Sequence, residues 1–349
     1  MRGDVSEQAT SGKWSRGTLE RLGACPACGC VSDKDVRMVR RDDQCAMPDA
    51  WQLIRCASCA SVYLDPRPSA DSLARAYEDY YTHADEAAPS HGGLVSSLVN
   101  GYLNRRFNMR RLPASPVGWW VMRTLPPLRM KLDVFGRHVS PAVCKTGGRL
   151  LDVGCGNGAF LLRARAMGLC VQGQEPDPRA VEACLKHGLD VYQDDIFSAR
   201  WPVHSYDWIT MNHVIEHVEA PHILIDRAYQ LLAPGGTLWL GLPNPGALGL
   251  KFLGKGWKGL HPPYHLLIPS RCALQQWLLD TGFEEIEFLK RGSQSAGGWR
   301  ESAQIARREG LHARLRWLPA VHLLGEMLSS LGTHWSEETI LIARRPSDQ

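Results

Sequence analysis

The sequence lacks both a signal peptide and a membrane-spanning apolar run. Its first residues, MRGDVSEQATSGKWS, are polar and contain no apolar core of a signal peptide. No uncharged apolar run approaches the roughly 18 residues that a membrane-spanning helix needs. We therefore expect a cytoplasmic protein, a compartment in which thiols stay reduced and disulfides are rare.

The glycine-rich stretch RLLDVGCGNGAF lacks the features of two common cofactor-binding turns. A phosphate-binding P-loop needs Gly-Lys-Ser/Thr, and GNGAF has neither the lysine nor the hydroxyl. The dinucleotide fingerprint places its third glycine one residue later than Gly158. An acid, Asp152, stands two residues before Gly154, where it would repel a diphosphate. A cationic ligand with an amino-acid tail would suit this position.

Because disulfides are not expected, the eleven cysteines need another explanation. Two C-x-x-C pairs, CPAC and CASC, are separated by 27 residues. Such pairs bring four thiolates around one tetrahedral Zn²⁺ and leave no open position for catalysis. A thioredoxin-like redox motif, the alternative, has no support in the surrounding sequence. We predict a structural zinc ribbon whose ligands are Cys25, Cys28, Cys56 and Cys59, with Cys30 and Cys45 as spare thiols.

From Gly148 onward, short apolar runs alternate with segments of helical periodicity. The expected strands are GRLLDVG, LCVQGQEP, LDVYQDDI, YDWITMNHV, TLWLGLPN, FEEIEFLK and ETILIARR. Strands that alternate with helices of this length indicate an α/β fold with a mostly parallel sheet. In such sheets the ligand binds beyond the carboxyl ends of the strands, which is where the glycine-rich turn falls.

Acidic residues stand at the ends of the first three expected strands. Asp152 ends the first strand, and Glu175 ends the second strand 23 residues later. A carboxylate at the second position can accept hydrogen bonds from both ribose hydroxyls. Asp195 after the third strand can accept from an adenine amino group, and the backbone N–H of Ile196 can donate to a ring nitrogen. Together these acids predict an adenosine ligand with a free 2′-hydroxyl.

The motifs LLDVGCGNGAF, GQEPDP, YDWITMNHVIEHVEAP and LLAPGGTLWLGLPN make residues 148–345 resemble class I S-adenosylmethionine-dependent methyltransferases. The resemblance implies a Rossmann-like seven-stranded sheet that ends in an antiparallel hairpin. It also implies that the cofactor, S-adenosyl-L-methionine, is surrounded by one set of residues: Asp152, Gly154, Cys155, Gly156, Gly158, Glu175, Asp195, Ile196 and Asn212.

The N-terminal segment CPACG…RCASCASVYLDPRPS…YEDYY resembles the zinc-ribbon extension of bacterial methyltransferases that act in sugar, polysaccharide and secondary-metabolite pathways. Ala60 departs from the glycine expected after the second cysteine pair. We expect a flexible tail over 1–22, a zinc ribbon over 23–66 and a helical cap or linker over 67–146. The methyltransferase domain then covers 147–349, with a helical insertion over 291–334.

Two groups of residues are candidates for contact with the methyl acceptor. In related enzymes the residues just after the fourth strand face both donor and acceptor, so His217, His213 and Glu216 are the candidates for proton removal. The alternative is that they make structural hydrogen bonds at a helix start. A loop after the fifth strand, WKGLHPPYHLLIPS, commonly covers the acceptor in this family, which makes His261, Tyr264 and His265 candidate substrate-binding residues. The alternative is a proline-bent loop with surface histidines.

Two stretches of the chain are strongly basic. Gly101–Arg149 contains ten Lys/Arg and one acid, and Leu289–Ala320 contains seven Lys/Arg and two acids. Amphipathic helices in these regions could touch the inner face of a membrane, which would suit a lipid-linked acceptor. Alternatively, they cover the active site and pack on each other or on a second subunit.

These patterns predict a methyltransferase that acts on a small molecule, a sugar or a glycan- or lipid-linked intermediate, with O-methylation favoured over C- or N-methylation. A second hypothesis is RNA methylation, with the ribbon and the basic stretches holding phosphate. Against it, residues 1–60 contain nine bases and eight acids, and no Asn/Asp-Pro-Pro-Tyr/Phe run is present. A third hypothesis is a non-catalytic protein that keeps the cofactor-binding fold.

Overall fold

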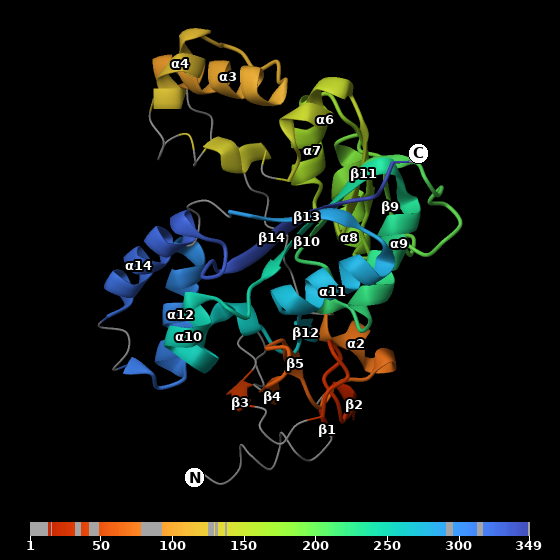
Figure 1. Ribbon diagram of the computed structural model, residues 1–349, viewed down its shortest axis with the longest axis vertical. Coiled ribbons are helices and arrows are strands. Elements are labelled where there is room, and N and C mark those ends of the chain that lie inside the picture. Colours follow the sequence, from red (N-terminus) through yellow and green to blue (C-terminus); the bar gives the residue numbers. More distant parts are fainter. Residues whose placement is uncertain are drawn as a thin grey trace.

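The computed structural model describes residues 13–14, 16–31, 36–41, 49–77, 93–124, 129, 132–136, 138–290, 296–312 and 317–347. Cys45, predicted as a spare thiol, lies outside these residues. Figure 1 shows small N-terminal sheets at the bottom, a large sheet in the centre, and helices α3 and α4 at the top. A further group of helices, α10, α12 and α14, lies beside the large sheet (Figure 1).

The central sheet has seven strands and confirms the predicted α/β class. Only β14 runs antiparallel to its neighbours, so the last two strands form the expected antiparallel pair. The strand order is β13 (Glu284–Leu289), β14 (Glu338–Arg344), β11 (Leu232–Pro243), β10 (Tyr206–Asn212), β7 (Arg149–Val153), β8 (Cys170–Gln174) and β9 (Val191–Tyr192). Strands β8 and β9 lie on one side of β7, and β10 and the later strands lie on the other side. The strand order therefore reverses between β7 and β10, and ligands of open α/β sheets bind at such a point.

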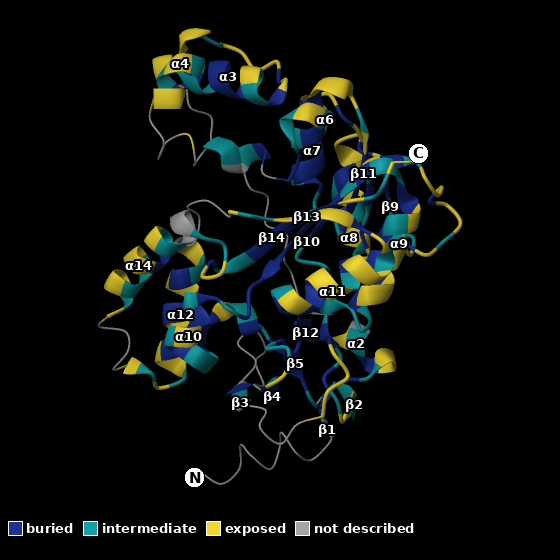
Figure 2. Ribbon diagram, viewed as in Figure 1, coloured by how far each residue is buried: buried dark blue, intermediate teal, exposed yellow. Residues whose placement is uncertain are grey.

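Alternating side chains of the strands fill two separate cores, one on each face of the sheet. On β7, Leu150 belongs to one core and Leu151 to the other, as the two-residue period of a strand requires. Helices α6 (Pro141–Thr146), α7 (Ala159–Ala166) and α8 (Pro178–Lys186) cover the first face. Helices α9 (Pro221–Leu231) and α11 (Arg271–Thr281) cover the second. The buried strands contrast with the exposed outer surfaces of these helices in Figure 2.

Helices α3 (Leu94–Phe107) and α4 (Val117–Thr124) cross closely and extend the first core. A Cβ atom at Gly101 would lie 1.8 Å from the Ser115 carbonyl oxygen, and one at Gly118 would lie 1.9 Å from the Leu98 carbonyl oxygen. Only glycine permits this approach of the two backbones. From α3, Tyr102 is buried in the same core as the sheet residues. This helical pair lies within the segment predicted as a cap or linker.

Between β13 and β14 the chain forms α12 (Ala296–Arg308) and α14 (Leu318–Leu331). Trp299 of α12 is buried together with Leu253 of α10 (Leu248–Leu253), so the insertion packs beside the sheet rather than on it. Several large apolar side chains of this region remain exposed, namely Trp317, Leu323, Leu324 and Met327. Within the described residues, no helix is long and apolar enough to cross a membrane.

The N-terminal region forms two small antiparallel sheets. One contains β1 (Lys13–Trp14), β2 (Gly17–Glu20) and β6 (Arg67–Pro68). The other has the order β12 (Leu267–Ile268), β5 (Val62–Leu64), β4 (Ala50–Arg55) and β3 (Val36–Arg41). Strand β12 therefore joins the ribbon although it follows the large sheet's β11 in the chain.

The hairpin of β1 and β2 falls inside residues 1–22, for which the sequence predicts a flexible tail. Trp14 explains why this hairpin packs on the ribbon. Its ring packs edge-on against Trp51 of β4, with ring centroids 5.5 Å apart, and it is buried. A tryptophan buries a large apolar area and anchors a hairpin too short to be stable alone.

Candidate functional site

The glycine-rich turn connects β7 to α7 in an unusual backbone conformation. Gly154, Gly156 and Gly158 have φ values of 68°, 55° and 77°, in the left-handed region that favours glycine. A Cβ atom at Gly154 would lie 2.7 Å from the Val214 side chain. The N–H groups of Gly154 and Cys155 both donate to the Gln174 carbonyl. The turn is therefore held against the end of β8, and it brings its backbone close to any ligand there.

Glu175 lies buried at the end of β8 and is fixed by the same turn. Its Oε2 accepts a 2.7 Å hydrogen bond from the Gly156 N–H, and its Oε1 accepts one of 3.0 Å from the Asp177 N–H. Each carboxylate oxygen has further lone pairs, so both can also accept from ligand hydroxyls. This arrangement fits the ribose-binding role expected of Glu175.

Asp152 is the second buried acid of this site. It is 5% exposed, and its Oδ1 accepts a hydrogen bond from the Thr210 hydroxyl. Burial raises the pKa of Asp152 to about 7, with a smaller contribution from the negative charge of Glu175. The ionised form of this buried carboxylate is stabilised strongly by a neighbouring cation. The ammonium group of the cofactor's amino-acid tail would supply that cation.

The remaining expected cofactor residues lie at the ends of the next strands. Asp195 is exposed, and its Oδ1 accepts from the Phe197 N–H, so the side chain also closes its own turn. Ile196 is buried, and its carbonyl accepts from Arg227. Asn212 ends β10 beside Gly241 of β11. Their positions agree with a ligand that extends along the carboxyl edge of the sheet from β10 to β9.

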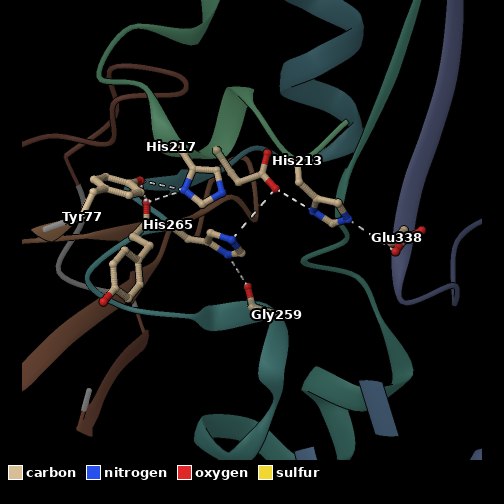
Figure 3. Close-up of polar contacts among 8 residues, drawn as sticks. Tyr77, His213, His217, Gly259, His265 and Glu338 are labelled. Carbon is tan, nitrogen blue, oxygen red and sulfur yellow. Dashed lines mark hydrogen bonds and ion pairs between the residues drawn. The ribbon is translucent and has the colours of Figure 1, made fainter. Parts of the chain in front are cut away.

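On the other side of β10, His213 is held between two carboxylates. It adopts a left-handed conformation with φ of 57°. Its Nδ1 lies 2.9 Å from Glu216 Oε1, and its Nε2 lies 3.5 Å from Glu338 Oε1 at the start of β14 (Figure 3). Burial lowers the pKa of His213, but the hydrogen bonds to Glu216 and Glu338 outweigh it and raise the pKa to about 10. His213 is thus a cation at neutral pH, and it cannot accept a proton there.

His217 has a ring orientation fixed by its neighbours. Its Nδ1 lies 3.0 Å from the Tyr264 carbonyl and 2.9 Å from the Tyr77 hydroxyl. Because a carbonyl only accepts hydrogen bonds, this contact assigns the proton to Nδ1 and the lone pair to Nε2. Burial lowers the pKa of His217, so the ring is neutral near pH 7. This histidine has the protonation state that a general base requires.

His265 repeats the arrangement of His217 on the facing loop. Its Nδ1 donates to the Gly259 carbonyl at 2.8 Å, and its ring centroid lies 4.7 Å from that of His217. Burial lowers the pKa of His265 as well. The Leu266 N–H donates to the Glu216 carbonyl at 2.8 Å, which ties the loop to the 3-10 turn Ile215–His217. Figure 3 shows the rings of His217 and His265 side by side.

The structure brings the two predicted acceptor-side groups together, but their residues differ in burial and in which atoms face the site. The Tyr264 ring is 2% exposed and packs among the core side chains of the ribbon region. Its carbonyl contacts His217, and its ring packs against the rings of Tyr77 and His261, with centroids 5.4 and 4.9 Å away. His261 is half-buried at a φ of 36°, and burial lowers its pKa to about 3. His261 therefore stays neutral at physiological pH.

Two further residues of this site carried no clear signal in the sequence. Tyr77 is one of three tyrosines in the segment YEDYY, where a core position is the more typical role and the edge of a cofactor pocket is the alternative. It follows α2 (Ala70–Ala76) and contacts His217 through its hydroxyl. Glu338 lies 125 residues beyond His213, and only the pairing of β14 with β11 brings the two together.

The four predicted zinc ligands gather at one point of the ribbon. The Sγ atoms of Cys25 and Cys59 are 3.7 Å apart, as are those of Cys28 and Cys56. Zn–S bonds of about 2.3 Å in a tetrahedron require S···S separations of about 3.8 Å. The residues present therefore fit Zn²⁺, and four thiolates would complete its coordination. Cys30 is exposed and is not part of this group.

The ribbon is bound to the acceptor-side loop by several polar contacts as well as by β12. Arg40 donates to the Trp257 carbonyl at 2.6 Å, and Arg55 donates to the Pro245 carbonyl at 2.7 Å. The Ser270 N–H donates to the Ser61 hydroxyl at 2.9 Å, two residues from Cys59. The region around the four-cysteine cluster thus supports the loop that carries His261 and His265.

Comparison with known proteins agrees with this geometry. A family described as a methyltransferase domain matches residues 131–287. The chain contains a class I S-adenosylmethionine-dependent methyltransferase domain. The methyltransferase is 28% identical, over 54% of its length and 84% of the relative's, to a ubiquinone biosynthesis O-methyltransferase of Xanthomonas campestris pv. campestris. The corresponding protein of Xanthomonas oryzae pv. oryzae is 26% identical over the same shares of the two chains.

Among solved structures, a SAM-dependent methyltransferase from Archaeoglobus fulgidus aligns with a TM-score of 0.42 and 16% identity, covering 70% of this chain and 98% of that one. The family implies S-adenosylmethionine as the cofactor, and the buried acids and the glycine turn fit it. When bound, this cofactor supplies an electrophilic methyl group and a good leaving group. The contribution of the protein is to hold the donor at the sheet edge and to align an acceptor with it.

Proposed function

We propose that this methyltransferase transfers a methyl group to a hydroxyl of a small molecule. The observation that carries the proposal is the state of His217 at the end of the 3-10 turn after β10, where its Nε2 lone pair lies beside buried Glu216 and His265. A hydroxyl acceptor must lose a proton as its oxygen attacks the methyl carbon. A neutral imidazole with a fixed tautomer can accept it. The two related Xanthomonas proteins are described as O-methyltransferases, which supports oxygen as the acceptor atom.

His217→Ala tests this assignment. It should lower turnover by about 10²-fold or more, the usual contribution of a general base, while the affinity for S-adenosylhomocysteine stays unchanged. His222→Ala is a matched control, because His222 is exposed on α9. Transfer of a tritiated methyl group into fractionated metabolites, followed by mass spectrometry of the product, would identify the acceptor. Equal turnover in wild type and His217→Ala would remove His217 from the mechanism.

For the acceptor class, we propose a sugar or a glycan- or lipid-linked intermediate. The resemblance of the ribbon-bearing N-terminus to methyltransferases of sugar and polysaccharide pathways supports this class. Purified nucleotide sugars, lipid-linked sugars and phenols should be compared as acceptors at equal concentration. A clear preference for phenols would overturn the sugar assignment and leave O-methylation intact.

Peripheral contact with an anionic membrane belongs to the same proposal, because it would bring the enzyme to a lipid-linked acceptor. Its support is the exposed apolar face of α14, with Leu323, Leu324 and Met327, inside an insertion whose sequence is basic. Co-sedimentation with phosphatidylglycerol vesicles should fall strongly in Leu323→Ser/Met327→Ser. Vesicles of phosphatidylcholine alone provide the control. Equal sedimentation of variant and wild type would exclude this face.

A further inference from the structure

We propose that Glu216, His217 and His265 form a second metal site, specific for a divalent transition-metal ion. One ligand atom of each residue lies within 4.8 Å of those of the other two. All three residues are on the acceptor side of the sheet, and they come from two segments that the Leu266–Glu216 backbone hydrogen bond holds together. Glu216 and His265 are buried, and His217 is half-buried.

The hydrogen bonds of the two histidines prepare both rings for metal binding. His217 Nδ1 and His265 Nδ1 each face a backbone carbonyl, of Tyr264 and Gly259 respectively. This leaves both Nε2 lone pairs for a ligand. Metal-binding histidines typically donate their other N–H to a carbonyl or carboxylate, which fixes the tautomer and the ring orientation.

The Glu216 carboxylate is incompletely satisfied in a way that a cation would correct. Its side chain is fully buried, and its Oε2 has no hydrogen-bond partner within the part of the chain that the structure describes. Its Oε1 already accepts a 2.9 Å hydrogen bond from His213 Nδ1 and lies 4.0 Å from His265 Nε2, with no proton between this oxygen and the His265 lone pair. A buried acceptor without a donor is costly. A cation bound between Glu216, His217 and His265 would pair with both the Glu216 carboxylate and the His265 lone pair.

The donor set indicates the class of metal. Two imidazole nitrogens and one carboxylate suit Zn²⁺, Fe²⁺, Co²⁺ and related ions, and they leave coordination positions open for another ligand. This contrasts with the four cysteines of the ribbon, which would fill the coordination sphere of a zinc ion. The two sites are separate in residues and in chemistry.

The role of such an ion rests on the proposed function. An acceptor hydroxyl bound at an open position would have a lowered pKa and release its proton to solvent. The alkoxide oxygen would then form the new C–O bond as the methyl C–S bond breaks, with the electron pair passing to sulfur. With an ion bound, the His217 lone pair is a metal ligand, and the ion activates the acceptor hydroxyl in place of His217 acting as a base. His217→Ala lowers turnover in either case.

Zinc stoichiometry tests the site directly. The full-length protein is equilibrated with excess Zn²⁺, freed of unbound metal by gel filtration, and analysed by elemental mass spectrometry. We expect two zinc ions per chain in wild type and in His222→Ala, and one in Glu216→Gln and in His265→Gln. Glutamine approximates the volume of either side chain, and circular dichroism verifies folding. One ion in wild type, or two ions in both site variants, would overturn the proposal.

Cobalt substitution provides a second readout that separates the two sites. Co²⁺ bound by four cysteines gives intense thiolate charge-transfer absorption, whereas Co²⁺ bound by nitrogen and oxygen gives only weak visible bands. The weak bands should be absent in His265→Gln while the thiolate bands remain. Weak bands of equal intensity in wild type and His265→Gln would count against the site. Neither measurement depends on methyl transfer, so a failure of the proposed function would be seen separately, as absence of product with every acceptor.

Discussion

Asp152 and Thr210 face each other on neighbouring strands β7 and β10, and a 2.6 Å hydrogen bond joins the Thr210 hydroxyl to Asp152 Oδ1. The pKa of Asp152 is nevertheless raised to about 7, because burial disfavours its charged form. Without cofactor, this burial therefore lowers stability as the pH rises from about 4 to about 7. A bound cation favours the charged form of Asp152 instead, since only the ionised carboxylate attracts a cation.

We therefore predict that the affinity for S-adenosylhomocysteine increases as the pH rises from about 6 to about 8 and then levels off, because below pH 7 binding must displace a proton from Asp152. In Asp152→Asn the affinity should be weaker and nearly independent of pH over this range. Titration calorimetry at several pH values measures both. Parallel pH profiles for the two proteins would contradict this account of Asp152.

Glu175→Gln should weaken cofactor binding and loosen the glycine turn at the same time. The glutamine amide nitrogen cannot accept the hydrogen bond that one carboxylate oxygen receives from Gly156 or Asp177. Loss of a hydrogen bond to a buried charged group costs about 1.5–3 kcal/mol, which corresponds to roughly a 10- to 150-fold loss of affinity for S-adenosylhomocysteine. Glu182→Gln, at an exposed position of α8, is the control and should bind as wild type does. Calorimetry would refute the prediction if both variants bound equally.

The two C-x-x-C turns of the ribbon have the same backbone conformation but different residues at one position. Gly29 has a φ of 72° and Ala60 a φ of 62°, and each N–H donates to the carbonyl of the first cysteine of its pair. An L-residue in this conformation is strained. We predict that Ala60→Gly stabilises the zinc-loaded protein by about 1 kcal/mol and that Gly29→Ala destabilises it by about 1–2 kcal/mol.

Urea unfolding of Ala60→Gly and Gly29→Ala measures both free energies. A Cβ atom at Gly29 would meet no neighbouring atom within 4 Å, so backbone strain alone determines the second value. Changes of the same sign in the two variants would show that the left-handed conformation does not govern stability here.

Removal of the ribbon zinc should affect the acceptor-side loop more than the cofactor turn. Strand β12 pairs with β5, and Ser61 holds Ser270, so loss of the metal would release the segment that follows His265. Hydrogen exchange after treatment with a strong chelator should show faster exchange at Leu267 and Ile268, with little change in β7 and β10. Equal protection of β12 before and after chelation would show that the zinc does not stabilise the acceptor-side loop.

The large sheet and the cofactor side were predictable from sequence because their signals are local. A buried parallel strand is a short apolar run, and the glycines of the turn and the acids at strand ends lie next to those runs. The four-cysteine cluster was equally predictable, because two C-x-x-C pairs at this spacing can bring four thiolates to one point. Asp152, Glu175 and the four cysteines accordingly lie where the sequence indicated.

The acceptor side was less predictable because its contacts join distant parts of the chain. The contact of Tyr77 with His217 and that of Glu338 with His213 depend on how the ribbon and the last strand pack. No local pattern distinguishes a core tyrosine from one whose hydroxyl meets a histidine. The tautomers of His217 and His265 likewise depend on carbonyls that only the folded loop supplies.

Strand β12 has a consequence for how such enzymes can be rearranged. Two residues of the methyltransferase domain complete a sheet of the ribbon region, so no single cut in the sequence separates the two regions in space. Removal of residues 1–92 would leave the buried rings of Trp257 and Tyr264 without their partners from the ribbon. Grafting a ribbon from one enzyme onto another would therefore succeed only if residues 244–270 were transferred with it.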